Sequence, residues 1–406
     1  MKHADARAVA ESAARSSYGR LVAILAAPTG DLPLAEDAVA AAFEQALTTW
    51  PDAGIPNNPE GWLLTVARNQ QRDVWKSSSR RKSAPIEDWT TPIIHAASPI
   101  DDLDPNAIPD KRLELLFVCA HPAIEPAVRT PLMLQTVLGF DAAQIARAFA
   151  TPTTTMAQRL VRAKKRIKDA RIPFTVPGRK SMSERLPPVL EAIYGCYAIS
   201  WPSTESAPES LGGEAKYLAV TLAELLQSNS EAWGLAALIT LSLSRSNAQP
   251  HSFVPLDEQD TRAWDIILIA EGESYLRRAT RPGAPGRFQL EAAIQAVHCA
   301  RARTGATDWA DLRTLYAALL VIAPSRGAQV AHAAVVGQID GAESGLQLLD
   351  ALSGSASNFQ PYHVLRADLL SRAGRQAEAR SAYTSAISLT EDLFVREHLD
   401  GRRRRL

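Results

Sequence analysis

Residues 153–167, TTTMAQRLVRAKKRI, combine basic and amide side chains with a regular apolar stripe. Met156, Leu160, Ala163 and Ile167 recur at helical spacing, which predicts a helix that packs one face on a core. The other face carries donors suited to phosphates and base edges, with Thr155, Gln158, Arg162 and Lys165 at its centre and Arg159 and Arg166 on its flanks. For a helix taken alone, a solvated basic surface is the simpler interpretation.

The residues before this helix favour a DNA-binding role. In the segment GFDAAQIARAFATP, Asp141 is a plausible N-cap of a short helix. The buried side of that helix is expected at Ile145, Ala146 and Phe149. After a tight turn, Thr151 can cap the next helix, with Pro152 at its first position. A short helix, a turn and a second helix with a polar outer face are typical of a helix-turn-helix, whose second helix enters the major groove.

Two other groups contain residue types that can take part in catalysis or metal binding. Acidic residues gather in the range 257–273, and paired carboxylates can act as acid and base or bind a hard cation. Placed on helices these acids scatter, which favours a solvated or interface face. His298 and Cys299 are adjacent, so on a helix they point about 100° apart and are expected to be packing residues. With no nucleophile, metal set or phosphate loop, the sequence predicts no enzyme, metal or cofactor.

Composition limits how the chain can meet nucleic acid. The 406 residues carry no net charge, so affinity must come from local basic patches. Cys119, Cys196 and Cys299 stand far apart, which argues against a disulfide framework or zinc site and fits a reducing cytoplasm. Charged residues interrupt the N-terminal stretch, so we expect neither a signal peptide nor a membrane span. The predicted location is cytoplasmic.

The chain divides into compositional zones. Residues 1–82 contain an Ala-rich helical pattern at 36–50 and a second helix from Trp62 whose later half is basic. Residues 83–110 form an acidic, proline-rich linker without Lys or Arg, either a plain tether or a segment that occupies a basic groove. Residues 111–177 hold the helix-turn-helix. There Pro131 must kink its helix or open a new one after Thr130.

The last zone, residues 183–406, is expected to be helical throughout. Apolar residues repeat at three and four, Gly, Pro and Ser separate the repeats, and no strand pattern occurs. Near the end, one helical hairpin has the small and large spacing of a tetratricopeptide unit, at Ala367, Leu370, Gly374, Ala379, Tyr383 and Ala386. The predicted fold is all-α, with one stacked, tetratricopeptide-like body at the C-terminus. The closing GRRRRL is expected to fray.

Three segments carry a family resemblance. LAEDAVAAAFEQALTTW, NPEGWLLTVARNQQRDVW and IARAFATPTTTMAQRLVRAKKRI, in this order and spacing, resemble regions two and four of bacterial RNA polymerase sigma factors of the extracytoplasmic-function (ECF) type. The remainder resembles the long C-terminal extension of one such group, so the resemblance covers nearly the whole chain. It departs at CYAISWPSTESAPES, where relatives are expected to carry an FNEGY-like stretch.

The resemblance implies specific contacts. Core RNA polymerase would be bound through its β′ clamp helices and β flap, with docking by the side chains that we expect to be exposed there, Glu36, Asp37, Glu44 and Gln45. The minus-ten promoter element would be bound and opened by Asn69, Arg72, Asp73, Lys76, Arg80 and Arg81. The minus-thirty-five element would be read by Thr154, Thr155, Gln158, Arg159, Arg162 and Lys165. Trp75 is either a stacking surface for single-stranded DNA or a buried side chain.

These implications predict a sigma factor that directs transcription initiation and is regulated in cis by its C-terminal domain, where a signalling partner would bind. The alternative is a helix-turn-helix regulator with a helical-repeat sensor that never enters holoenzyme. The basic helix of residues 62–82 counts against that alternative, because an ordinary regulator needs no module that opens DNA.

Overall fold

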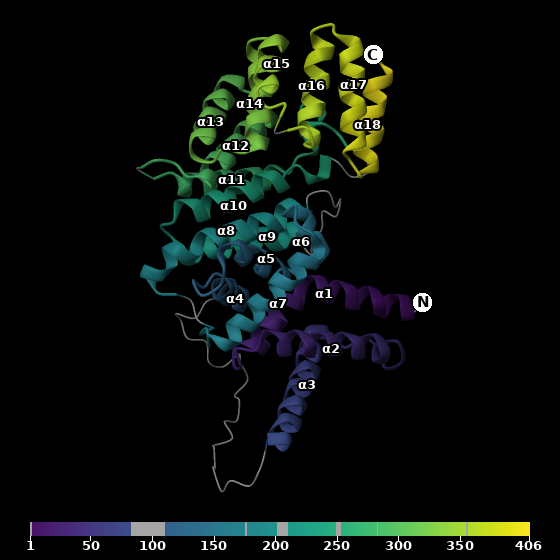
Figure 1. The fold of residues 1–406 in the computed structure, drawn as a ribbon, viewed down its shortest axis with the longest axis vertical. Helices are drawn as coiled ribbons and strands as arrows, with labels where there is room; N and C mark the ends of the chain where they lie inside the picture. Colours follow the sequence, from purple (N-terminus) through teal and green to yellow (C-terminus); the bar gives the residue numbers. More distant parts are fainter. Residues whose placement is uncertain are drawn as a thin grey trace. The chain divides into compact units, whose positions relative to one another are not determined.

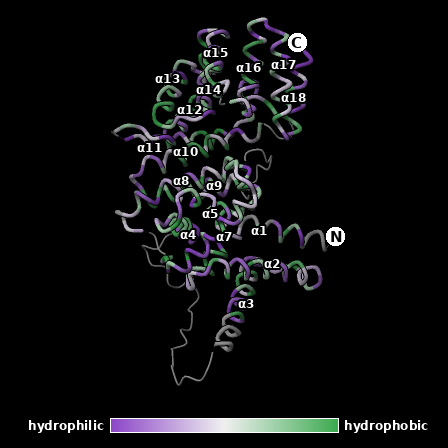
Figure 2. Tube along the Cα trace, in the orientation of Figure 1, coloured by the Kyte–Doolittle hydropathy of each residue, from purple (hydrophilic) through white to green (hydrophobic). Residues whose placement is uncertain are grey.

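Helices form every regular element in the part of the chain that the structure describes. This computed structural model describes residues 2–82, 110–174, 177–200, 210–248, 253–281, 283–354 and 356–406. Hydrophobic and hydrophilic residues are interleaved along the helices (Figures 1 and 2), as amphipathic packing requires. The all-α prediction is confirmed. The predicted acidic linker lies outside the described residues, apart from its last residue, Asp110.

The chain forms two compact units, of which the first comprises residues 1–200 and 207–225. It begins with α1 (Lys2–Ala26), α2 (Leu32–Ala53) and α3 (Pro59–Lys82), which pack against one another. Asp31 caps α2 by accepting a hydrogen bond from the backbone N–H of Leu34. The Ala-rich pattern of α2 places small buried residues along its length, including Ala35, Ala38 and Ala42. Small side chains let neighbouring helices approach closely.

Four shorter helices follow: α4 (Lys111–Cys119), α5 (Pro126–Thr136), α6 (Ala142–Ala148) and α7 (Thr153–Asp169). Residues 112–119 of α4 are all buried. A helix that is buried all round lies inside a core, and α4 contacts α1, α5 and α8 (Arg179–Ser200). Pro131 lies inside α5, so no new helix opens after Thr130. Because α5 begins only at Pro126, the backbone bond that Pro131 cannot make falls near the start of the helix.

Two further helices complete the first unit. Helix α8 packs on α4 and α5, and α9 (Leu211–Leu226) follows it in the same unit. All but the first four residues of α8, and all of α9, lie in the C-terminal zone that the sequence predicts from residue 183 onward. The domain boundaries given from sequence stay predictions.

The second unit contains residues 226–406, with residues 201–206 assigned to it. Among the described residues, three single 3-10 turns lie between α10 and α11. The α-helices are α10 (Ser230–Leu243), α11 (Ile266–Ala279), α12 (Arg287–Thr304), α13 (Trp309–Ile322), α14 (Arg326–Ile339), α15 (Ala342–Asp350), α16 (Gln360–Arg372), α17 (Gln376–Ser388) and α18 (Leu393–Arg404). From α10 onward each α-helix packs against the next one along the chain. This sequential packing is what a stacked helical body requires.

The last three helices share one hydrophobic core. Ala367 and Leu370 of α16 pack with Ala379 and Tyr383 of α17, as the hairpin pattern predicts. The prediction of a frayed C-terminus is wrong, because α18 is helical through Arg404. Arg402 forms ion pairs with Glu258 and Asp368, and Arg403 pairs with Asp400. These ion pairs hold arginines of the C-terminal basic run in place, although their like charges repel one another.

Candidate nucleic-acid interface

Helix α7 has the two faces that its sequence predicts. Met156, Leu160, Ala163 and Ile167 are buried. Its last turn is basic, which is favourable at the negative end of the helix dipole. The buried stripe therefore fixes α7 on the core and leaves its polar face to solvent.

The short helix before α7 is capped as predicted, but the turn differs in detail. Asp141 and Gln144 form a reciprocal capping box at the start of α6. Phe149 is 40% exposed rather than buried, because it is the C-cap residue of α6 and lies in the turn. Thr151 does not cap α7, since its hydroxyl donates to the Phe149 carbonyl. Pro152, predicted at the first helical position, is instead the N-cap residue.

The proposed base-reading residues of α7 differ in exposure. Thr154, Gln158, Arg162 and Lys165 are exposed, whereas Thr155 and Arg159 are partly buried. The guanidinium of Arg162 donates to the Gln158 carbonyl across one turn, at 3.4 Å. The exposed residues lie at intervals of three or four and therefore share one side of the helix. This side of α7 is accessible from solvent.

Two lysines on another side of α7 point to α2. Lys164 Nζ lies 2.7 Å from a carboxylate oxygen of Glu36, and Lys168 Nζ lies 2.6 Å from one of Asp31. The Lys164 and Glu36 side chains are only 12% and 15% exposed. The sequence analysis treats Glu36 as an exposed docking residue, and that expectation of exposure is wrong. Burial raises the pKa of Glu36, and Lys164 opposes part of this shift.

The remaining residues of the expected polymerase-docking set are exposed on α2. Asp37, Glu44 and Gln45 are all exposed, and Leu47 exposes 48% of its surface beside them. An exposed leucine next to acidic side chains is a candidate contact, since apolar anchors surrounded by polar groups are typical of binding surfaces. Glu44 and Leu47 are three residues apart and therefore share one side of the helix, and this spacing was the signal in the sequence for such a contact.

Helix α3 carries the second predicted DNA contact. Asn69, Arg72 and Asp73 are exposed near its middle. The helix continues through Lys82, but the side chains of Trp75, Lys76, Arg80 and Arg81 lie outside the described part of the chain. Near the start of α3, Trp62 meets the buried Trp50 of α2 edge to face, with ring centroids 5.5 Å apart. This contact fixes α3 on α2.

Comparison with known proteins matches two segments of the chain to families. Residues 14–81, which include the second half of α1, all of α2 and all of α3 except its last residue, match Sigma-70 region 2. Residues 185–280 match a family of unknown function, DUF6596. An uncharacterized protein of Rhizobium meliloti (strain 1021) is 36% identical over 383 residues, which cover 91% of this chain and 90% of that protein. The chain belongs to the same family as this Rhizobium protein.

Two further relatives match a smaller part of the chain. Two strains of Mycobacterium tuberculosis have a "Probable ECF RNA polymerase sigma factor SigI" that is 30% identical over 165 residues. The match covers 40% of this chain and 55% of those proteins. No solved structure matches. The region-two match and the likeness to these sigma factors support a sigma factor role.

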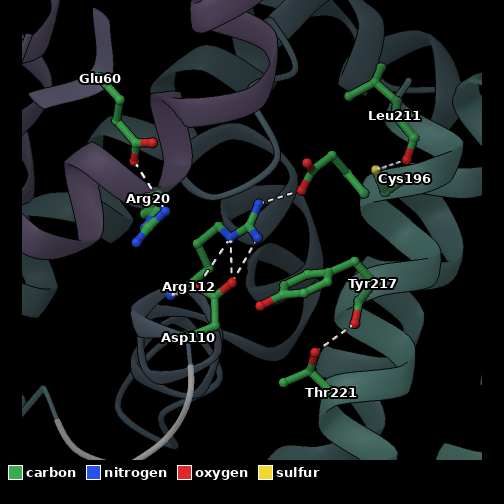
Figure 3. A network of polar contacts seen from close by, with 9 residues as sticks. Arg20, Glu60, Asp110, Arg112, Cys196, Leu211, Tyr217 and Thr221 are labelled. Atoms are coloured by element: carbon green, nitrogen blue, oxygen red, sulfur yellow. Dashed lines mark hydrogen bonds and ion pairs between the residues drawn. The ribbon is translucent and has the colours of Figure 1, made fainter. Parts of the chain in front are cut away.

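The DUF6596 segment contributes helices to both units, with α8 and α9 in the first and α10 and α11 in the second. Its α9 contacts the N-terminal end of α4 through a polar network that includes Asp110, Arg112 and Tyr217 (Figure 3). Arg112 donates to both carboxylate oxygens of Asp110 and forms an ion pair with Glu214 of α9. Its guanidinium also lies over the ring of Tyr217, 5.3 Å from the centroid.

This network is largely closed to solvent. The side chains of Arg112, Asp110 and Glu214 are 11%, 5% and 21% exposed. Burial alone would lower the pKa of Arg112, but its bonds to the two carboxylates outweigh burial and raise it. Arg112 is therefore charged at all physiological pH values. Sequence analysis missed it, although an arginine two residues after an N-cap aspartate was a visible signal.

Several acidic residues of the range 257–273 have structural partners. Asp260 pairs with Arg262, Asp265 caps α11, and Glu258 pairs with Arg402. In the described residues no group of three or more His, Cys, Asp or Glu side chains is arranged to hold a metal ion. No helix described here is both long and apolar enough to cross a membrane. Cys299 is buried in α12.

Proposed function

We propose that this protein is an ECF-type sigma factor that binds core RNA polymerase and directs it to specific promoters. The observation that supports the proposal is the presence, in one chain, of a match to Sigma-70 region 2 and of the capped helix α6 followed by α7, which exposes Gln158, Arg162 and Lys165. Region two would provide polymerase docking and minus-ten recognition. Helix α7 would read the minus-thirty-five element in the major groove.

Polymerase docking is assigned to the exposed acidic side of α2. Charge reversal at Asp37 and Glu44 together should weaken core polymerase binding, because both carboxylates face solvent. Leu47→Ser should weaken it further by removing an apolar contact. Binding is measured by fluorescence titration with core polymerase. Glu60→Lys, on α3, is the control for each single reversal, because it changes the charge by the same amount as Asp37→Lys or Glu44→Lys alone. Wild-type affinity for the Asp37→Lys, Glu44→Lys variant, with folding intact, would show that α2 does not dock there.

Base reading is assigned to the exposed side of α7. Gln158→Ala or Arg162→Ala should each cost about 1 to 3 kcal/mol of discrimination at particular promoter positions, because bidentate groups read base edges. Lys165→Ala should instead weaken binding evenly and reduce its salt dependence. Titration of matched and scrambled promoters separates these effects. Equal losses on both DNAs for all three variants would mean that α7 only binds phosphate.

Minus-ten recognition is assigned to α3. Asn69, Arg72 and Asp73 are exposed on one stretch of this helix, and the proposed set also includes Lys76, Arg80 and Arg81. Run-off transcription from a linear promoter and from the same promoter with an unpaired minus-ten segment tests the assignment. Arg72→Ala should reduce transcription from the paired template more than from the unpaired one, since only the first must be opened.

The C-terminal extension is proposed to act in cis. Its first two helices pack in the same unit as α4 and α5, and Glu214 binds Arg112. The rest would be a tetratricopeptide-like body that receives a signalling partner. A tethered domain meets its target at roughly millimolar effective concentration, so weak contacts suffice. The informative truncation ends after residue 226, because it removes the second unit and keeps α8 and α9. Promoter activity equal to that of the full chain would refute regulation by the second unit.

A further inference from the structure

Two arginines from different helices bind the turn between α4 and α5. Arg129 of α5 donates from Nε to the Ile124 carbonyl at 2.9 Å and from Nη2 to the Pro122 carbonyl at 3.4 Å. Arg166 of α7 donates from Nε to the Ala123 carbonyl, also at 3.4 Å. Each guanidinium has five N–H donors, so most donors of both groups remain available to another partner. Three successive carbonyls of one turn therefore hold the two cations near each other.

A third arginine comes from α8. Arg185 is the first residue of the segment that matches DUF6596, and α8 packs on α5. Burial, and then Arg185 and Arg129, lower the pKa of His121 in the turn. Burial and Arg129 also lower the pKa of Arg185, while Glu184 acts in the opposite direction. The guanidinium groups of Arg185 and Arg129 therefore lie close enough to repel each other, with His121 beside both.

His121 adds a neutral donor to these three cations. Its Nδ1 accepts a hydrogen bond from the backbone N–H of Ala123, at 3.1 Å. Because its pKa is lowered from 6.5, the ring is neutral at pH 7 and carries its one proton on Nε2. We call Arg129, Arg166, Arg185 and His121 the basic ridge. The basic ridge therefore offers a ligand N–H donors and no acceptor.

Nothing in the described part of the chain neutralises the basic ridge. No carboxylate of the described residues forms an ion pair with Arg129, Arg166 or Arg185. Glu125 and Glu184 are near them in the sequence, but both of these side chains are exposed to solvent. The Nε of Arg185 is buried without a hydrogen-bond partner. Like charges held together in this way destabilise the free protein, and an anion bound between them would remove the repulsion.

The basic ridge continues the exposed basic side of α7. Arg166 follows Lys165 and lies one turn after Arg162, and all three are exposed. Helix α5 packs against both α7 and α8, so the ridge runs from α7 across the start of α5 to α8. Packed helix axes lie about 8–10 Å apart, which places α7 and α8 at most roughly 20 Å apart. At about 3.4 Å per base pair, roughly 20 Å is the length of about six base pairs of B-DNA.

We propose that the basic ridge binds the phosphate backbone of promoter DNA beside α7, so that the DUF6596 segment adds a DNA contact of its own through Arg185. This inference rests on the proposed function, because it takes the duplex read by α7 as the ligand. Phosphate oxygens accept hydrogen bonds and the ridge donates them, so the two are complementary. Such a contact carries no sequence information and instead fixes the position of the protein on the duplex.

The salt dependence of DNA binding tests this contact. The full-length chain is titrated with a fluorescent duplex of about 30 base pairs and mixed sequence, between about 50 and 250 mM salt, since a backbone contact needs no promoter sequence. Each neutralised phosphate contributes about 0.9 to the slope of log K against log salt. Arg185→Gln should therefore reduce the slope by about 0.9 and the affinity about eightfold at about 0.1 M salt.

Three further variants make the test specific. Arg185→Lys keeps the charge and should retain most of the slope. Arg7→Gln, at an exposed position of α1, is the control of equal charge change and should leave the slope unchanged. Lys165→Gln, on the exposed side of α7, should reduce the slope about as much as Arg185→Gln. Urea unfolding of Arg185→Gln should show at least wild-type stability, because the substitution relieves repulsion, whereas loss of a merely structural side chain would lower stability.

Two outcomes would overturn the inference. One is a wild-type slope for Arg185→Gln in the same series in which Lys165→Gln reduces it, because the duplex would then contact α7 without reaching α8. The other is a wild-type slope together with weaker binding of core polymerase, which would assign the ridge to an acidic protein surface. Failure of the proposed function has a different signature. In that case neither Lys165→Gln nor Arg185→Gln would change the slope, and both assignments would be wrong.

Discussion

Substitutions at Arg112 should show how strongly the DUF6596 helices are tied to α4. Arg112→Met removes the cation and keeps an unbranched side chain of similar length. Asp110 and Glu214 then remain as two carboxylates that are 5% and 21% exposed. Loss of one partner from a buried ion pair typically costs about 3 to 5 kcal/mol. We expect the free energy of unfolding of the first unit to fall by about 3 kcal/mol, toward the low end because Glu214 keeps some solvent.

Glu214→Gln should have a smaller effect on the free energy of unfolding. The sign of this effect should depend on whether Arg112 is present. In the wild type it weakens one charge-assisted contact while Arg112 keeps Asp110, so we expect a loss of about 1 to 2 kcal/mol. In the Arg112→Met background the same substitution removes a repulsive carboxylate and should recover about 1 kcal/mol. Arg7→Met is the control. Its pair with Glu11 lies on α1, and both side chains are exposed, at 76% and 52%, so its loss should cost no more than about 0.5 kcal/mol.

Urea unfolding of the full-length chain measures these changes in the free energy of unfolding. Hydrogen exchange shows which helices they affect. Arg112→Met should speed exchange of the amides of α4 and α9 and leave α16 and α17 unchanged. The reasoning would be refuted if Glu214→Gln destabilised the unit equally in both backgrounds. Additive losses would mean that Arg112 and Glu214 do not interact and that α9 is held by apolar packing alone.

Two predictions concern the second unit. Burial and then Arg245 and Arg301 lower the pKa of His298 to about 4 from 6.5, so the unfolded chain binds more protons between these values. Stability should therefore be complete above about pH 6.5 and fall by about 3 kcal/mol as the pH approaches 4. Urea unfolding across this range should show a flatter dependence for His298→Gln than for the control His363→Gln. Gly234→Ala should cost about 1 to 3 kcal/mol, because its Cβ would lie 2.7 Å from the backbone nitrogen of Gln289, whereas Gly327→Ala should not destabilise. A Gly234→Ala chain of wild-type stability would contradict the close packing of α10 on α12.

Local patterns predicted the elements that local forces determine. The buried stripe of α7, the cap at Asp141 and the hairpin of α16 and α17 all follow from spacings within one or two helices. The helical fold of every described segment follows from the same periodicity. Phe149 was wrongly predicted to be buried. A residue at the end of a short helix can either continue the buried stripe or turn away from it, and Phe149 turns away.

The other errors involve residues far apart in sequence. Glu36 was expected to be exposed, but its partner Lys164 is 128 residues away. The C-terminal arginines were expected to fray, but Arg402 meets Glu258, which is 144 residues away. Arg112 and Glu214 are separated by 102 residues. A single sequence contains no signal for which solvated faces of two helices will meet, so these contacts could not be predicted from periodicity or charge.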